Sequence, residues 1–333
     1  MDLRPPSRSV YRHVPCAQFQ NAINMNVLLI GEESAGIQTL KALARSDHRI
    51  VAVMASPAKK SLSSSTLWQV AERIGLPTWP ASHVKDPAFV GRICDAGVDI
   101  ILNVHSLFVM HGEVVEAPRI GSFNLHPGPL PRYAGLNVVS WAIYRGEQTH
   151  GVTVHKMAAG IDTGPIVYQS LFDIESADSA LTLYAKCTKE GVALLLRLLE
   201  TASRDESAIP LLPQDLTMRQ YFGKEVPENG RVNWSRRARE IVNLARACDY
   251  YPFPSPWGYP RARLGGREIG VIKARLTGES CNTAPGTIGR LSGTSVQVAC
   301  ADEWIWVDKA LIEGTYLPAA GILRPGGRLY NGI

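Results

Sequence analysis

Short apolar runs alternate with amphipathic segments along the first third of the chain, and this alternation constrains the fold more than any other feature. The runs at Asn26–Ile30, Arg49–Ala55 and Val98–Val104 have the length of strands, and segments with helical spacing separate them. Gly75 and Pro77 end one of these helical segments. Strands that alternate with helices build a parallel sheet covered on both faces. We therefore expect an α/β fold with a doubly wound, mostly parallel, Rossmann-like sheet.

The chain changes character after a long leucine-rich segment with helical spacing, Ala177–Glu200. Residues 205–230 are polar and contain several prolines, which is typical of a linker. A further helix is expected at Ser235–Asp249, and short strands joined by turns follow it. Many short strands in so little chain predict a smaller, OB-like C-terminal β-barrel. We expect an N-terminal extension (1–24), a doubly wound domain (25–204), a linker (205–230) and a helix with a small barrel (231–333).

Composition excludes several classes of protein. Of the 333 residues, 45% are hydrophobic and 20% are charged, so the chain has enough apolar surface to fold. The six cysteines are scattered without a CxxC pair, which argues against a zinc cluster, a thioredoxin-type motif and a disulfide framework. The formal net charge of +5 permits an anionic substrate without requiring nucleic acid.

Neither a signal peptide nor a membrane span is expected. Residues 1–24 contain no apolar core of signal-peptide length, and we expect a flexible extension there, with Met25 as an alternative start. No apolar run approaches the roughly 20 residues that span a bilayer. The sequence therefore predicts a cytoplasmic protein that binds neither a membrane nor a metal ion.

The turn after the first strand, Gly31–Gly36, superficially looks like a phosphate-binding loop. Glu33 stands where the dinucleotide fingerprint has its second glycine. The carboxylates of Glu32 and Glu33 would also repel a pyrophosphate. We therefore expect a strand-to-helix turn without a dinucleotide.

Polar side chains of catalytic type gather between Ser122 and Val167. Asn124 and His126 lie two residues apart on one expected strand, so their side chains face the same side of the sheet. Asp162 lies in a turn between two expected strands, near the edge where open α/β sheets bind ligands. The spacing alone leaves two interpretations open: a catalytic cleft, or polar core groups bonded to the backbone.

Motifs in the same stretch have the order and spacing of a known family. Asn-x-His, a Pro-Leu-Pro loop, Gly-Val-Thr and Gly-Ile-Asp-Thr-Gly follow one another, with 36 positions from His126 to Asp162. They resemble the 10-formyltetrahydrofolate-dependent formyltransferases. Motifs near the C-terminus resemble the small domain of methionyl-tRNA and sugar formyltransferases, and the resemblance covers roughly residues 25–333. The segments that carry it are Phe123–Gly135, Gly151–Thr153, Gly160–Gly164, Val232–Trp234, Pro285–Ile288 and Arg324–Leu329.

The resemblance implies an enzyme whose doubly wound domain transfers a formyl group. Formyl transfer passes through a tetrahedral oxyanion, which a carboxamide N–H of Asn124 would stabilise. The neutral imidazole of His126 would act as the general base. Asp162 would orient His126, raise its proton affinity or relay protons.

The resemblance also implies 10-formyltetrahydrofolate as the co-substrate, bound in an apolar pocket without a metal ion. His105 and His111 flank part of this pocket, and we expect both to be loop histidines rather than catalysts. The pocket residues would be Leu107, Phe108, Val109, Met110, Ala158, Ala159, Gly160 and Ile161.

Two departures from the family pattern constrain the acceptor. Many members have Ser-Leu-Leu-Pro after the histidine, where this chain has the stiffer loop Pro127–Pro131. Methionyl-tRNA enzymes carry a basic loop where Ser56–Ser65 has only Lys59 and Lys60. We therefore favour a primary amine of a specialised metabolite, an amino sugar or a carrier-bound aminoacyl group over tRNA.

The basic run at Arg231–Arg246 is expected to be a solvated helix face rather than a phosphate site.

Two other activities stay open at this point. Methionyl-tRNA formylation is one alternative, and hydrolysis of 10-formyltetrahydrofolate by the same three residues is the other. A non-catalytic folate-binding module would have no need of Asp162. The sequence predicts no particular oligomeric state.

Overall fold

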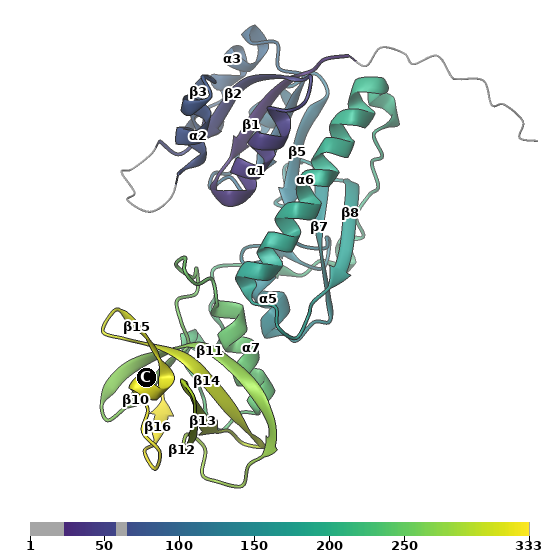
Figure 1. Cartoon of the computed structure of the whole chain (residues 1–333). Helices are drawn as coiled ribbons and strands as arrows, with labels where there is room; N and C mark the ends of the chain where they lie inside the picture. The colour runs from purple at the N-terminus through teal and green to yellow at the C-terminus, as the bar shows by residue number, and fades with distance from the viewer. Residues whose placement is uncertain (1–22, 58–64, 333) are drawn as a thin grey trace, which may run out of the picture.

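Strands and helices alternate in the computed structural model, which describes residues 23–57 and 65–332 (Figure 1). The expectations for residues 1–22 and for Lys59 and Lys60 lie outside the described residues. In the part of the chain that is described, no helix is both long enough and apolar enough to cross a membrane.

The N-terminal sheet is formed, among the described residues, by β1 (Asn26–Gly31), β2 (Arg49–Ala55), β3 (Thr78–Pro80), β4 (Ile100–Val104), β5 (Gly121–His126), β7 (Thr149–Lys156) and β8 (Ile166–Asp173). Their order across the sheet is β3-β2-β1-β4-β5-β7-β8. The first five run parallel, whereas β7 is antiparallel to β5 and β8 is antiparallel to β7. The direction of winding reverses between β1 and β4, which makes that point the topological switch of the sheet.

Helices cover both faces of this sheet. They are α1 (Glu33–Leu43), α2 (Leu67–Arg73), α3 (Phe89–Asp95), α4 (Gly112–Glu116), α5 (Val138–Tyr144) and α6 (Ala180–Arg204). Val27 and Leu29 of β1 belong to a core shared with α1 and α6, whereas Leu28 and Ile30 belong to a core shared with α3 and α4. Successive residues of a strand point to opposite faces, so this split confirms the predicted doubly wound fold.

The C-terminal part is a curled antiparallel sheet with one long helix, α7 (Ala238–Cys248), packed against it. Its strands are β10 (Arg261–Leu264), β11 (Arg267–Ser280), β12 (Ile288–Ser292), β13 (Ser295–Ala299), β14 (Glu303–Ile312), β15 (Thr315–Pro318) and β16 (Leu329–Asn331). Their order is β12-β13-β14-β11-β10-β16, with β15 beside β14. A bridge between Thr287 and Arg328 brings the two edges together, as the predicted small barrel requires. The predicted fold class is therefore confirmed in both parts.

Several short elements were not predicted. They are β3, α4, β15 and β16 together with the 3-10 turns η1 (Ala81–Lys85), η2 (Glu206–Ala208), η3 (Leu216–Met218), η4 (Pro227–Gly230) and η5 (Ala319–Gly321). None is longer than five residues, and so short a segment carries no readable period.

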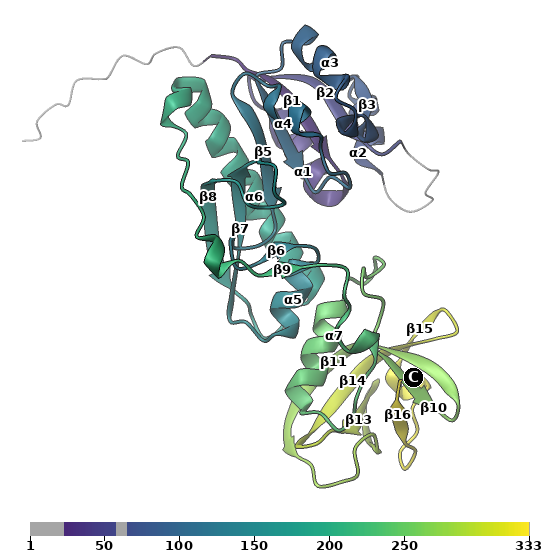
Figure 2. The same ribbon diagram turned by 180° about the vertical axis from the view of Figure 1, so that it is seen from behind.

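The segment 205–230, predicted as a linker, lies along the N-terminal sheet (Figure 2). Leu212 forms a bridge with Ile166 at the start of β8. Further on, β9 (Tyr221–Phe222) pairs in parallel with β6 (Ala134–Gly135). The segment therefore connects two parts of the chain, and it also contacts the loops that follow β5 and β7.

Candidate active site

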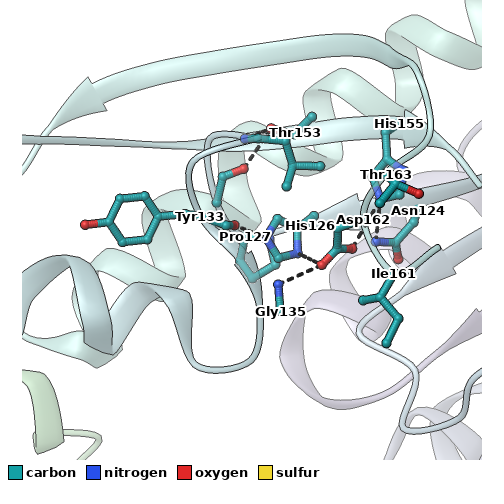
Figure 3. A network of polar contacts seen from close by, with 12 residues as sticks. Asn124, His126, Pro127, Tyr133, Gly135, Thr153, His155, Ile161, Asp162 and Thr163 are labelled. Carbon is teal, nitrogen blue, oxygen red and sulfur yellow. Dashed lines mark hydrogen bonds and ion pairs between the residues drawn. The ribbon is translucent and has the colours of Figure 1, made fainter. Parts of the chain in front are cut away.

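The end of β5 and the turn between β7 and β8 bring Asn124, His126 and Asp162 together (Figure 3). Nδ1 of His126 lies 3.6 Å from Oδ2 of Asp162. Both side chains are buried, and Asn124 is half-buried beside them. Residues 36 positions apart in the sequence thus share one polar cluster.

His126 is held in one tautomer. Nε2 lies 2.5 Å from the carbonyl oxygen of Tyr133, which only accepts, so Nε2 carries the hydrogen and donates it. Nδ1 of the neutral ring is then a free acceptor on the side of Asp162. Burial lowers the pKa of His126 and outweighs the Asp162 carboxylate, which raises it. The neutral ring that a general base needs is therefore the resident form at neutral pH.

Asp162 is held ionised although it is buried. Burial alone would raise its pKa, but the positive charge of His126 in its protonated form and a hydrogen bond from the Gly135 N–H hold the pKa well below its usual range. The Gly135 nitrogen lies 2.8 Å from Oδ2, and Nε2 of His155 lies 3.4 Å from Oδ1. A permanent negative charge thus stands next to the free nitrogen of His126.

The carboxamide of Asn124 is oriented by a chain of hydrogen bonds. Asn103 on β4 donates to Oδ1 of Asn124 at 2.8 Å, so Oδ1 is already used. Nδ1 of His155 must donate to the Lys156 carbonyl at 3.0 Å, which leaves Nε2 to accept from Nδ2 of Asn124 at 3.1 Å. Nδ2 of Asn124 therefore keeps one further N–H for a bound ligand.

His155 was not predicted from the sequence. It lies directly opposite Asn124 in the pairing of β5 with β7. The only sequence signal was its place two residues after Thr153 on an expected strand. That signal becomes meaningful only once the register between the strands is known.

The loop after His126 is fixed by side chains from β7 and β8. The hydroxyl of Thr153 donates to the Gly128 carbonyl at 2.7 Å, and Nε2 of His150 donates to the Pro127 carbonyl at 2.9 Å. Gln169 donates to the Leu130 carbonyl at 3.0 Å. A Cβ on Gly128 would lie 2.6 Å from the Tyr133 oxygen that accepts from His126, so only glycine fits there. The predicted stiff loop is thus also tied to the sheet.

Replacing His150 with glutamine is expected to make the protein less sensitive to acid. Burial lowers the pKa of His150 to about 4, against 6.5 in the unfolded chain. At pH values between these two pKa values, His150 is protonated in the unfolded chain but stays neutral in the folded chain. The stability due to neutral His150 is therefore complete above pH 6.5 and falls by about 3 kcal/mol toward pH 4.

A glutamine at this position can still donate to the Pro127 carbonyl but does not titrate. Urea unfolding at pH 7 and pH 4 should show a loss on acidification that is smaller by about 3 kcal/mol in His150→Gln than in the wild type. His83→Gln, at an exposed position, serves as the control and should behave like the wild type. An equal acid loss in both variants would contradict this assignment.

The Asp162 turn is held from outside the sheet. Asp162 has a φ of +56°, in the left-handed region. Gln214 donates to the carbonyls of Asp162 at 3.0 Å and Gly164 at 2.6 Å, and Arg219 donates to the Ile161 carbonyl at 3.0 Å. Sequence reasoning missed Gln214 and Arg219 because both lie in the segment assigned as a linker.

The residues predicted for the folate pocket lie in different environments. Leu107 and Val109 are exposed by 69% and 71%, which is unusual for such side chains, whereas Met110 is buried in the core beside α3 and α4. Phe108 packs at the edge of that core beneath the ammonium of Lys85. The segment 158–161 is exposed. Their role in folate binding stays a prediction.

The described residues contain no group of three histidine, cysteine, aspartate or glutamate side chains arranged to hold a metal ion. The cluster itself offers one neutral base, one carboxylate and one free amide N–H.

Comparison with known families gives two matches. The model described as "Formyl transferase" matches residues 23–199. The model described as "Formyl transferase, C-terminal domain" matches residues 225–322. Together they span both parts of the fold.

Solved structures with the same fold include three that share 20–21% identity with this chain. A variant of HypX from Aquifex aeolicus is 21% identical, with a TM-score of 0.65, and the match covers 90% of this chain but 47% of HypX. This chain thus spans about half the length of HypX. An N-formyltransferase from Helicobacter canadensis is 20% identical, with a TM-score of 0.64 and coverage of 85% of this chain and 98% of that one. A sugar N-formyltransferase from a Shewanella species is 20% identical, with a TM-score of 0.59 and coverage of 78% and 99%.

Proposed function

This chain belongs to the formyl transferase family, and from that premise we propose that it transfers the formyl group of 10-formyltetrahydrofolate to a primary amine. The observation that carries the proposal is the cluster at the end of β5, where a half-buried Asn124 lies beside the buried His126 and Asp162. Two related structures support the co-substrate. The Helicobacter canadensis enzyme was solved with folinic acid and dTDP-3-aminofucose, and Aquifex aeolicus HypX was solved with tetrahydrofolic acid.

In the first step, the lone pair of the amine attacks the formyl carbon. The carbonyl π bond breaks, and the charge moves onto the formyl oxygen of a tetrahedral intermediate. The free N–H of Asn124 donates to this oxyanion. Because Asn103 and His155 already fix the amide, little reorganisation is needed when the charge appears.

In the second step, a proton leaves the attacking nitrogen for Nδ1 of His126. The ionised Asp162, 3.6 Å away, stabilises the imidazolium that forms. The intermediate then collapses, and the bond between the formyl carbon and N10 of the folate breaks. His126 returns the proton to N10, so the products are an N-formyl amine and tetrahydrofolate.

We place the folate between the segments 107–110 and 158–161. The exposed apolar side chains of Leu107, Val109 and Ile161 support this placement, since a flat aromatic ligand would cover them. On this proposal residues 25–204 are the catalytic domain, residues 205–230 the linker and residues 231–333 the accessory domain. A cytoplasmic location stays a prediction.

For the acceptor we propose an amine on a specialised metabolite, an amino sugar or a carrier-bound aminoacyl group. The relative solved with dTDP-3-aminofucose and the relatives named as sugar N-formyltransferases support an amino sugar. Methionyl-tRNA and water, the second giving a hydrolase, are the alternative acceptors that an experiment must separate.

The proposal is tested by following the release of tetrahydrofolate from 10-formyltetrahydrofolate with a panel of acceptors. The panel contains dTDP-3-aminofucose, other amino sugars, free amino acids, an aminoacylated carrier protein and methionyl-tRNA. We expect release that depends on one class of amine, with an N-formyl product of matching mass.

Formate is measured in the same reactions, with and without amine. Formate release that equals tetrahydrofolate release and ignores every amine would replace the transferase with a hydrolase. Tight binding of 10-formyltetrahydrofolate without turnover in any reaction would overturn the enzymatic proposal.

A further inference from the structure

A second Asn-x-His sequence lies beside the one in the candidate active site. Asn103-Val104-His105 at the end of β4 runs parallel to Asn124-Leu125-His126 on β5. The register pairs Asn103 with Asn124 and Val104 with Leu125, so His105 follows at the level of His126. The two asparagines are bonded to each other at 2.8 Å. The proposed mechanism uses neither of the ring nitrogens of His105.

The protonation of His105 follows from its neighbours. The hydroxyl of Tyr184 on α6 donates to Oε2 of Glu33 at 2.9 Å, because an ionised carboxylate only accepts. The hydroxyl oxygen of Tyr184 is then free to accept from Nδ1 of His105, with which it forms a short contact. His105 therefore carries its hydrogen on Nδ1, and Nε2 is an acceptor.

This acceptor has no partner among the described residues. Nε2 of His105 is fully buried without a hydrogen bond, and so is Oδ1 of Asn103, whose side chain is nine-tenths buried. Leaving a polar atom buried and unpaired costs free energy, so natural proteins rarely do so without a ligand or a water molecule to fill the site. Two such acceptors at the end of one strand indicate that a donor binds here.

The position of the pair supports a ligand rather than a packing accident. β1 and β4 flank the topological switch of the sheet, where open α/β folds bind ligands. Glu33 follows β1 and His105 follows β4, and both have left-handed backbones, with φ of +55° and +56°. Neither is a glycine, and strain of this kind clusters at functional sites.

We propose that Nε2 of His105 accepts one N–H of the acceptor amine, and that this contact makes the enzyme selective for primary amines. The proposal rests on the proposed function. A primary amine has two N–H groups when it attacks. One proton leaves to His126, while the other stays on the nitrogen, remains in the formamide product and is held by His105 throughout.

The site also sets the charge of the ligand portion that it accepts. Burial and, to a smaller extent, the neighbouring His126 lower the pKa of His105 to about 4, so the ring stays a neutral acceptor at physiological pH. The carboxylate of Glu33, which accepts from the Tyr184 hydroxyl, adds a negative charge on the Nδ1 side of His105. A phosphate would find two acceptors and a carboxylate here, so this subsite fits the amine end of the acceptor.

The first test compares the best amine of the panel with its N-methyl derivative. Wild type should strongly prefer the primary amine. His105→Leu should lose about 10- to 100-fold in kcat/KM for the primary amine, since its N–H is left without an acceptor. The same variant should process the two amines within about threefold of each other, because leucine neither accepts a hydrogen bond nor distinguishes them. Loss of folding would lower both rates without changing their ratio.

The second test uses a substitution at the exposed residue Glu33 to move the ring hydrogen of His105 from Nδ1 to Nε2. In Glu33→Gln the amide can donate to the Tyr184 hydroxyl, which can then donate to Nδ1 of His105 and move the ring hydrogen to Nε2. We expect the preference for the primary amine to fall at least fivefold. Nitrogen-15 NMR of histidine-labelled protein should show an unprotonated Nε2 for His105 in the wild type and a protonated one in the variant, with His105→Leu assigning the signal.

Glu32→Gln is the matched control. Glu32 accepts from the Ser56 backbone N–H at 2.6 Å, and an amide oxygen can do the same, so neither tautomer nor selectivity should change. A protonated Nε2 in the wild type, or an unchanged amine preference in His105→Leu, would overturn this inference and leave the transferase intact. Absence of amine-dependent turnover in the wild type would overturn the proposed function, and this inference with it.

Discussion

Replacing His126 with alanine is expected to lower kcat for amine formylation by about 100- to 10,000-fold, because the proton of the attacking nitrogen then has no base. Nδ1 of His126 is the one nitrogen of that ring left free by the Tyr133 carbonyl. The measurement is kcat at saturating amine and 10-formyltetrahydrofolate. His83→Ala, at an exposed position, is the matched control and should keep wild-type activity.

The pH profile of kcat separates the base from a structural role. Burial lowers the pKa of His126, so the acid limb of the wild type should have its midpoint below pH 6.5. Asp162 raises this pKa by its charge, so Asp162→Asn should move the limb to still lower pH while also reducing kcat. A limb that shifts upward in Asp162→Asn, or an unchanged kcat in His126→Ala, would rule out the proposed pair.

Replacing Asn124 with leucine is expected to lower kcat by about 100- to 1000-fold, which is the usual effect of losing one oxyanion donor. The free N–H of its Nδ2 is the donor that Asn103 and His155 leave available. Single-turnover formyl transfer measures the chemical step directly. Because the oxyanion forms only after the amine has attacked, and is absent when the co-substrate binds, the Kd for 10-formyltetrahydrofolate should change less than threefold.

Asn243→Leu provides the control for a buried asparagine. Asn243 lies on α7 and accepts from Arg246, away from the candidate active site. Its loss should leave the single-turnover rate near that of the wild type. A loss confined to folate affinity in Asn124→Leu would instead place Asn124 in the binding of the ground state.

Most of the longer strands and helices could be predicted from the sequence, because neighbouring residues in the chain indicate each of them. The run Asn26–Ile30 is buried on both faces in β1, as a continuous apolar strand requires. Thr66 caps α2 through a reciprocal bond with Gln69, next to the predicted helical spacing. Elements such as β3 and α4 were not predicted, because a segment of three to five residues is too short to show a hydrophobic periodicity.

The candidate site was predicted in part. Asn124 and His126 share one strand, and a strand places alternate side chains on one face whatever the rest of the fold does. Asp162 was found through a motif spacing, and the structure brings it to His126, while its catalytic role stays a prediction. The residues predicted to bind folate were inferred from the same family resemblance. Their solvent exposure varies widely, since Met110 is buried and Val109 is exposed.

The sequence by itself determined the alternating elements, the strand that carries Asn124 and His126, and the family motifs, because each of these depends on neighbours in the chain. Only the tertiary structure decided the rest. His155 meets Asn124 through strand register, and Gln214 reaches the Asp162 turn from 52 positions away. The tautomer of His105 depends on a hydroxyl brought from 79 positions away, and that of His126 on how the loop after β5 turns the Tyr133 carbonyl back toward the ring. A hydrogen-bond partner is fixed by position in space, and no local pattern of residues encodes that position.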